Sequence, residues 1–389
     1  RSAKMAVPPP IVSLSQIQVF GGLPAPFPLE AKSALLIDER TGTPLYSFNQ
    51  HEKMQPASLA KIMTFYLTLE ALAQKRIALD TQVNISEAAW RLSLNDTVSR
   101  MFLQVGQKVT VHDLLYGLMV SSGNDAAVAL AEYLGGSSDA FTKQMNEKAA
   151  QLGLTETHFA NPDGLPAEGE YTTAADMVKL GRDLQSRFPE SITYTSAKDY
   201  TFAAVGPEGK VTSITQRNFD TLLFYDARTD GIKTGHVDEA GFHLVASAHD
   251  GDMRLLSAVM GTTSMEKRRV ETKKIFDWAF RTFNTVHPDW HRTVPASLPV
   301  YQGTAEKVAL VPASDSYVTV ERGKEGHVSV SYIGDAKYMV APIAKGAVAG
   351  NMAVMQDGTQ IAAIPVVAQN AVPAAGFFKR LKDKLRMKL

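Results

Sequence analysis

The spacing of apolar residues predicts strands and helices in different parts of the chain. Residues 33–48, SALLIDERTGTPLYSF, contain two strand-like runs interrupted by a turn tripeptide, which predicts a hairpin. From Ser58 to about Ala175 apolar residues recur at intervals of three and four, so several helices are expected in succession. Thr110 and Thr173 each precede an aspartate by three positions, as a helix cap does. The first helix begins in QPASLAKIMTFYLTLEAL, and its pattern predicts an amphipathic helix.

Strand-like runs return from Tyr200. GFHLVASA and MRLLSAVMG flank an Asp-Gly turn signal at residues 249–252, which predicts a second hairpin. A helix is expected from Met265 to Phe283. Strands at both ends with helices between them indicate an α+β fold, in which distant hairpins build one antiparallel sheet. The prolines and glycines of residues 1–30 predict an extended arm with little regular structure.

The pattern changes after VHPDWHRTVPASLP. The runs SYVTVERG, HVSVSY and MAVMQDGTQIAAIPVV alternate with a period of two and are separated by glycines, which predicts a small β-rich domain. We place the boundary near residue 285. Residues 1–284 are thus expected to form the first domain, residues 285–372 the second, and residues 373–389 a tail.

The composition excludes several classes of protein. Forty basic and forty acidic residues cancel, so no global field favours nucleic acid, and no nucleic-acid partner is expected. The absence of cysteine excludes disulfides and thiolate catalysis. No His-Glu-x-x-His and no Gly-x-Ser-x-Gly pattern occurs, and neither a metal nor another cofactor is expected. No apolar run approaches the roughly 18 residues of a membrane-spanning helix. The opening RSAKMAVPPP suggests a processed or engineered start, which leaves export open.

Ser58 precedes Lys61 by three positions, so both lie on one face at the start of the first helix. A serine hydroxyl becomes a nucleophile when a base takes its proton, and a lysine acts as that base only if its ammonium form is disfavoured. The pattern alone is weak, because Ser264 and Lys267 repeat it. Charged neighbours are expected to keep Lys267 solvated and charged, so we favour the first pair.

Two further motifs become informative when they are considered together with Ser58 and Lys61. Ser122-Gly123-Asn124 could present a hydroxyl and an amide from a loop, although it also suits a helix cap, and Ser93-Leu94-Asn95 has the same form. Lys233-Thr234-Gly235 is predicted on a strand, where the glycine would let a substrate backbone come close, although a turn is the alternative. A second ammonium near Lys61 would depress the pKa of one of the two lysines and supply the neutral base.

In this order, SLAK, SGN and KTG resemble the active-site triplet of penicillin-binding proteins, and the Ser-Gly-Asn form resembles the low-molecular-mass D-alanyl-D-alanine carboxypeptidases. SALLIDERTG, LGLTETHFANPDGL and DGIKTGHVDEAGFHLVASAHDGDMRLLSAVMG are similar to the same family. The resemblance implies an α+β transpeptidase domain of the penicillin-binding and β-lactamase type, then a small β-rich domain and an amphipathic C-terminal helix. It also implies a serine peptidase of the bacterial cell wall that β-lactams acylate and inhibit.

The resemblance also implies roles for matching residues. Ser58 would attack the carbonyl between the two terminal D-alanines of a peptidoglycan stem pentapeptide, and Lys61 would accept its proton. Ser122 and Lys233 would return a proton to the leaving amine, and the backbone amides of Ser58 and His236 would form the oxyanion hole. The catalytic residues implied in this way are Ser58, Lys61, Ser122 and Lys233. The implied substrate-binding residues are Asn124 for the peptide amide, Thr234 and Arg268 for the terminal carboxylate, and also Gly235 and His236. Arg269 is the neighbouring alternative to Arg268.

Three other functions share parts of this signature. A serine β-lactamase has the same triplet but needs a dedicated deacylating base, and Asn161-Pro-Asp-Gly resembles the corresponding loop without its glutamate. A DD-endopeptidase would cut cross-linked peptides. A catalytically silent scaffold would bind the wall without a covalent adduct. The carboxypeptidase is the function that we predict.

The tail GFFKRLKDKLRMKL places Phe377, Leu381, Leu385 and Leu389 at a spacing of four, with mostly basic residues between them. Such a helix suits an anionic membrane surface. We therefore expect residues 376–389 to attach the protein to the inner membrane from the periplasm. A frayed terminus or a docked helix is the alternative.

Overall fold

The computed structural model describes residues 12–387, so the expectations for residues 1–11 and for Leu389 lie outside the described residues. Contacts between residues divide the chain into two compact units, Arg1–Phe280 and Arg281–Leu389. Every helix within residues 12–387 is too short or too polar to cross a bilayer.

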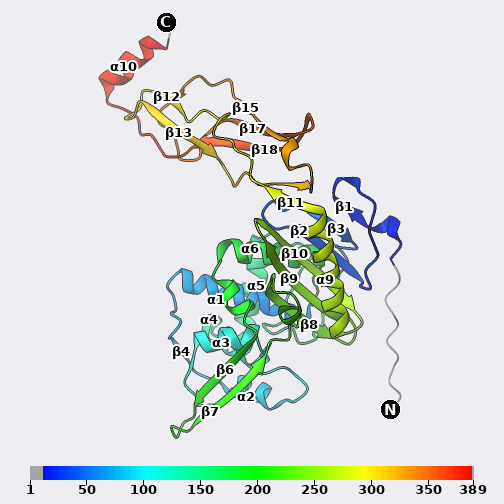
Figure 1. The fold of residues 1–389 in the computed structure, drawn as a ribbon. Helices are drawn as coiled ribbons and strands as arrows, with labels where there is room; N and C mark the ends of the chain where they lie inside the picture. The colour runs from blue at the N-terminus through cyan, green and yellow to red at the C-terminus, as the bar shows by residue number, and fades with distance from the viewer. Residues whose placement is uncertain (1–11, 388–389) are drawn as a thin grey trace. The chain divides into compact units, whose positions relative to one another are not determined.

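A six-stranded antiparallel sheet forms the centre of the first unit (Figure 1). In spatial order its strands are β1 (Gln18–Val19), β3 (Pro44–Phe48), β2 (Ser33–Asp38), β10 (Met253–Thr262), β9 (Gly241–Asp250) and β8 (Thr229–Val237). Leu36 of β2 lies opposite Ser257 of β10, so the two predicted hairpins pair with each other. The α+β class and the sheet of distant hairpins are confirmed. The edge strand β1, inside the predicted arm, was not foreseen.

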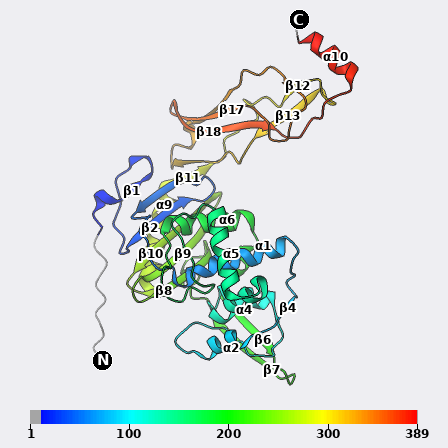
Figure 2. The ribbon, with the colours of Figure 1, turned by 180° about the vertical axis from the view of Figure 1, so that it is seen from behind.

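Helices cover both faces of this sheet. Figures 1 and 2, seen from opposite sides, show α9 (Met265–Thr282) on one face and α6 (Ala174–Arg187) on the other. Leu35 and Ile37 of β2 belong to the apolar core that includes residues of α6. On the other face Trp278 of α9 packs edge-on against Tyr46, with ring centroids 5.9 Å apart. Every residue of β2 is consequently buried.

α1 (Lys61–Ala73) runs through the helical core on the α6 side. Ten of its thirteen residues are buried, including Lys61 at its first position. The prediction of an amphipathic helix was therefore wrong, because a helix surrounded by protein needs no polar face. The remaining helices of this unit are α2 (Glu87–Leu94), α3 (Val111–Met119), α4 (Asn124–Gly135), α5 (Ser138–Gln151), α7 (Ser191–Thr195) and α8 (Leu222–Tyr225), with 3₁₀ turns η1 (Leu14–Gln16), η2 (Phe20–Gly22) and η3 (Ala57–Ala60).

Both predicted helix caps are present. The side chain of Thr110 accepts a hydrogen bond from the Asp113 amide at the start of α3, and Thr173 caps α6 in the same way. Two small antiparallel sheets lie beside the helices. They are β4 (Gln82–Val83) with β5 (Val109–Thr110), and β6 (Asp199–Val205) with β7 (Val211–Arg217).

The second unit is β-rich, as predicted. Its six-stranded sheet has the order β15 (Val328–Ile333), β17 (Val348–Gln356), β18 (Thr359–Ala368), β13 (Lys307–Pro312), β12 (Ser297–Tyr301) and β16 (Met339–Val340). Neighbours are antiparallel except for β12 and β16. β11 (Phe283–Val286) pairs with β14 (Val318–Glu321), and η4 (Glu325–His327) precedes β15. Val320, Met352 and Val366 belong to a separate apolar core.

α10 (Phe377–Arg386) follows this sheet with an exposed apolar surface. Phe377, Phe378, Leu381 and Leu385 are each at least 50% exposed. Asp383, in contrast, is buried, and its Oδ2 atom accepts a hydrogen bond from the Gln302 amide at 2.7 Å. The helix is thus tied to the end of β12 through its single acidic side chain.

Candidate active site

The residues predicted from the three motifs surround one cleft in the first unit, with a volume of about 610 Å³. Seven of them line the cleft directly: Ser58, Ser122, Asn124, Thr234, Gly235, His236 and Arg268. Lys61 and Lys233 are buried beside it, with 0% and 2% of their surface exposed. The fold therefore brings η3, the start of α4, β8 and the start of α9 to one place.

Ser58 lies in η3, the turn immediately before α1. Ala57 has a φ of +51°, a left-handed conformation that is costly for a residue with a Cβ atom. A loop after α5 packs against this turn. A Cβ atom on Gly164 would lie 1.7 Å from the carbonyl oxygen of Ala57, and Thr64 Oγ1 donates a hydrogen bond to the Pro162 carbonyl at 2.7 Å. These contacts hold Ser58 half-buried at the edge of the cleft.

Lys61 Nζ donates hydrogen bonds to three side-chain oxygens from two motifs. The distances are 2.7 Å to Ser58 Oγ, 2.8 Å to Asn124 Oδ1 and 3.4 Å to Ser122 Oγ. An ammonium group has three donors and no acceptor, so these partners saturate the charged form. A neutral amine has a free lone pair, which can accept the proton of Ser58.

Burial lowers the pKa of Lys61 to about 8. Asp163, Asp125 and Glu170 oppose this shift through their charges. Their effect is limited because burial also raises the pKa of each acid, to about 8 in the case of Glu170. Lys61 is therefore available as a neutral base at mildly alkaline pH.

Lys233 has an even less favourable place for a charge. Burial is the main cause that lowers its pKa well below the ordinary value, and the charges of Lys61 and Arg268 lower it further. Its Nζ atom donates a hydrogen bond to the Thr234 carbonyl at 3.1 Å. The expectation that a second ammonium would depress the pKa of one of the two lysines holds for Lys233, but repulsion is not the leading cause. Burial is the leading cause for both lysines, and the repulsion between them acts on Lys233.

The loop with Ser122 and Asn124 is held by one neighbouring segment, residues 99–103. Ser122 has a φ of +52°, and its carbonyl accepts a hydrogen bond from Ser99 Oγ. Both nitrogens of Asn124 donate to the Ser99 carbonyl at 3.0 Å. Behind the loop, buried Asp125 accepts hydrogen bonds from two backbone amides of residues 101–103 at 3.0 Å. These bonds fix the two side chains beside Lys61.

Gly235 lines the cleft, but its missing side chain makes room for the protein itself. A Cβ atom there would lie 2.9 Å from the Pro56 carbonyl oxygen and 3.3 Å from the Leu59 amide nitrogen. The glycine thus lets β8 approach η3, the turn that carries Ser58. Contact with η3 is thus a reason for glycine here that the sequence did not reveal.

Arg268 and His236 lie at the β8 side of the cleft. Arg268 Nη1 donates a hydrogen bond to the Gly235 carbonyl at 3.3 Å, and burial lowers the Arg268 pKa to about 10. The charge of Asp220 opposes that shift. The His236 ring stacks on Phe242, with centroids 3.8 Å apart. A buried guanidinium at the cleft wall suits a ligand carboxylate, which it can pair through two hydrogen bonds.

The repeated motif patterns and the alternative arginine lie elsewhere. Lys267 Nζ pairs with Glu30 at 2.6 Å, which raises the Lys267 pKa, and its amide donates to Ser264 Oγ as in a helix cap. Ser93 Oγ lies 2.6 Å from each of two backbone carbonyl oxygens, which share its single proton. Arg269 stacks on the ring of an exposed tyrosine, with its guanidinium 3.8 Å from the centroid. The prediction that Lys267 stays charged is confirmed.

Several buried acids around the site were missed from the sequence. They are Asp125, Asp163, Glu170 and Asp220. Burial raises the pKa of Asp220 to about 6, against the charges of Arg268 and Lys233. The turn signature Asn161-Pro-Asp-Gly could have drawn attention to Asp163. No local pattern marks the other three, because distant segments bury them.

Comparison with known proteins agrees with this geometry. The family model described as "D-alanyl-D-alanine carboxypeptidase" matches residues 23–264, and the model described as "Penicillin-binding protein 5, C-terminal domain" matches residues 283–374. The chain belongs to the D-alanyl-D-alanine carboxypeptidase family. It is a serine-type member among the low-molecular-mass penicillin-binding proteins, and membership implies peptide substrates and β-lactam binding.

Relatives in this carboxypeptidase family match over most of their length. D-alanyl-D-alanine carboxypeptidase DacA of Escherichia coli K12 is 36% identical over 362 residues, which cover 92% of this chain and 88% of that protein. Penicillin-binding protein 5 of Haemophilus influenzae has a crystal structure that is similar with a TM-score of 0.76 at 37% identity, over 88% of this chain and 97% of that chain. The Streptomyces K15 DD-transpeptidase matches 65% of this chain and 97% of its own, with a TM-score of 0.61 at 33% identity.

Proposed function

We propose that the protein removes the terminal D-alanine from peptidoglycan stem pentapeptides through an acyl-enzyme on Ser58. The observation that carries this proposal is the 2.7 Å contact between Ser58 Oγ and the buried amine of Lys61, whose pKa is lowered to about 8. A base with a pKa near the working pH takes a proton efficiently, and a serine needs such a base to become a nucleophile.

In the proposed acylation, Ser58 Oγ attacks the carbonyl carbon of the penultimate D-alanine while its proton moves to Lys61 Nζ. The negative charge on the carbonyl oxygen would be stabilised by the backbone amides of Ser58 and His236. The C–N bond then breaks, and the amine of the last D-alanine leaves with a proton returned through Ser122 and Lys233. The 3.4 Å contact between Lys61 Nζ and Ser122 Oγ supports this proton route. Water then hydrolyses the ester and restores Ser58.

Four residues of the cleft wall would hold the substrate. Asn124 Oδ1 and Nδ2 would bind the peptide amide, although in the free protein Oδ1 accepts from Lys61. Thr234 and Arg268 would bind the terminal carboxylate, since both line the cleft on its β8 side. Gly235 would contribute backbone contacts there.

Release of D-alanine from a stem pentapeptide tests this proposal. We expect the wild-type chain to release stoichiometric D-alanine and the Ser58→Ala variant to release none. Lys267→Ala, which alters the repeated Ser-x-x-Lys pattern outside the cleft, serves as a matched control and should retain full activity. Release by Ser58→Ala at the wild-type rate would refute the role of Ser58.

We further propose that β-lactams acylate Ser58 and that the protein works in the periplasm, attached to the anionic inner membrane surface by α10 and the residues after it. Exposed Phe377, Phe378, Leu381 and Leu385 support the attachment, together with the basic residues of the same helix. An apolar side chain at a bilayer interface gains from burial, and each basic residue near anionic lipid adds about 1 kcal/mol.

A further inference from the structure

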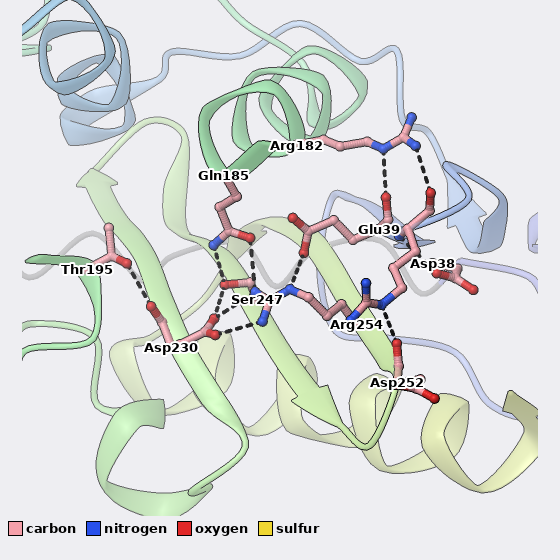
Figure 3. A network of polar contacts seen from close by, with 10 residues as sticks. Asp38, Glu39, Arg182, Gln185, Thr195, Asp230, Ser247, Asp252 and Arg254 are labelled. Carbon is pink, nitrogen blue, oxygen red and sulfur yellow. Dashed lines mark hydrogen bonds and ion pairs between the residues drawn. The ribbon is translucent and has the colours of Figure 1, made fainter. Parts of the chain in front are cut away.

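A buried polar network lies at the start of β8, three residues before Lys233 (Figure 3). The carboxylate of Asp230 is its centre. Arg254 Nη1 donates to Asp230 Oδ2 at 3.0 Å, and Arg254 Nη2 donates to Oδ1 at 3.3 Å. Ser247 Oγ also donates to Asp230 Oδ1. Three hydrogen bonds from two other strands, β9 and β10, therefore hold this one side chain.

The backbone at Asp230 is held as well. Thr195 Oγ1, at the end of α7, donates to the Asp230 carbonyl at 2.7 Å. A Cβ atom on Gly231 would lie 2.5 Å from Thr195 Cβ, so the two segments are in close contact. Gln185 of α6 joins the network, since it donates to Ser247 Oγ at 2.8 Å and accepts from Arg254 Nη2 at 3.1 Å.

The network coincides with a break in the pairing of β8 with β9. Thr229 lies opposite Ala248 and Gly231 lies opposite Ser247, so Asp230 is an extra residue on β8, as in a β-bulge. Beyond the bulge the pairing is regular, with Lys233 opposite Val245. Successive side chains of a strand point to opposite faces, so a slip of one residue would turn Lys233 away from its present side.

We propose that Asp230, clamped by Arg254 and Ser247, is a positioning residue for the acylation of Ser58. By holding the bulge in register, the clamp sets the face of β8 on which the Lys233 amine lies, beside Lys61. Asp230, Arg254 and Ser247 are not among the residues that line the cleft within the described chain, so they act through Lys233 and do not touch the substrate. This inference rests on the function and the role of Lys233 proposed above.

The network offers a matched pair of variants. Asp230→Asn and Glu39→Gln each replace a carboxylate side chain that is 10% exposed and pairs with Arg254, at 3.0 and 3.1 Å, by the amide of the same shape. Only Asp230 belongs to β8. We expect the acylation rate constant with saturating fluorescent penicillin to fall about tenfold or more in Asp230→Asn, because small misplacements of a catalytic group have effects of this size. Glu39→Gln should acylate at the wild-type rate constant.

Rate and amplitude together separate positioning from general destabilisation. A variant that is only less stable would label a smaller fraction of molecules with an unchanged rate constant, whereas displacement of Lys233 lowers the rate constant of the folded fraction. If Asp230→Asn does not fold, Ser247→Ala, which removes one bond to Asp230, should slow acylation about threefold.

Three results would overturn the positioning role. They are a wild-type rate constant in Asp230→Asn, an equal loss in Glu39→Gln, and a wild-type rate constant in Ser247→Ala where Asp230→Asn does not fold. Failure of the wild-type protein to label would instead refute the proposed function.

Discussion

Lys61 is the residue on which the chemistry of the cleft depends, because it has no exposed surface and contacts Ser58 directly. Its lowered pKa makes the neutral fraction grow as pH rises toward about 8. We expect the acylation rate constant to rise about tenfold per pH unit below that value and to level off above it, since the base acts only when neutral.

Stopped-flow labelling with penicillin across this pH range measures the profile. The Lys267→Ala variant is the control and should give the same curve, since Lys267 pairs with Glu30 outside the cleft. Acylation that is independent of pH between about 6 and 9 would contradict a lysine base with this pKa.

Glu170 is the basis of a second prediction for a single residue, which concerns how the stability of the protein depends on pH. Burial holds its pKa at about 8 in the folded protein, above the ordinary 4.5. Between these values the folded state keeps a proton that the unfolded state has released, so the contribution of Glu170 to stability is present below pH 4.5 and falls as pH rises to about 8. Glu170→Gln removes this titration. We expect the free energy of unfolding of the variant, relative to wild type, to increase by on the order of 1 kcal/mol from about pH 5 to about pH 9.

Urea unfolding at the two pH values tests this expectation. A variant whose stability relative to wild type is the same at both would show that Glu170 titrates alike in the folded and unfolded chains.

The sequence could predict that Ser58, Lys61, Ser122 and Lys233 meet at one cleft, because their three motifs occur together and in the order of a known family. It could not identify Asp125 or Asp220, because their burial depends on segments that are remote in the chain. The same reason explains why the main cause of the lowered lysine pKa values was missed. The predicted repulsion does lower the pKa of Lys233, but burial, which no local pattern records, is the larger cause for both lysines.

At the scale of elements, the turn η3 and the loop at residues 161–165 support each other. Gly164 has a φ of +83° and no room for a Cβ atom beside Ala57. Gly169 in the same segment has a φ of +79° and open space around it. We expect Gly169→Ala to lose about 1 kcal/mol of stability from backbone strain, and Gly164→Ala to lose about 1–3 kcal/mol more from the clash. Gly164→Ala should also slow acylation, because it displaces the turn that carries Ser58.

Thermal unfolding and penicillin labelling of both variants measure these effects. Equal stability of the two would mean that the contact between Gly164 and Ala57 is not tight.

Hairpins and caps could be predicted because turn residues and apolar periodicity are local signals. The burial of α1 could not be predicted, because the hydroxyls of its polar residues Thr64 and Thr68 donate hydrogen bonds to backbone carbonyls inside the core. Likewise, the need for glycine at Gly235 comes from η3, which only the folded chain brings near.

At the scale of the whole molecule, the family and the order of its two domains were legible from the sequence, since the motifs and the β-rich pattern are spread over most of the chain. The burial of Asp383 could not be predicted from the sequence, because the tail pattern indicates only an apolar and a basic side of the helix. Its bond to Gln302 leaves the apolar residues of α10 exposed.

Removal of residues 376–389 tests the proposed membrane attachment. We expect the full chain to sediment with vesicles rich in anionic lipid, to be released by high salt, and to bind purely zwitterionic vesicles weakly, because the basic residues of α10 interact with anionic headgroups. The truncated chain should stay in the supernatant and still be acylated by penicillin. Sedimentation of the truncated chain to the same extent would refute attachment through this segment.

The position of the penicillin adduct bears most directly on the central claim that Ser58 is the nucleophile in a cleft shared by Lys61, Ser122 and Lys233. Peptide mapping by mass spectrometry after brief labelling should find one penicilloyl group, on Ser58, and none in the Ser58→Ala variant. An adduct on another residue, or undiminished labelling of Ser58→Ala, would contradict it.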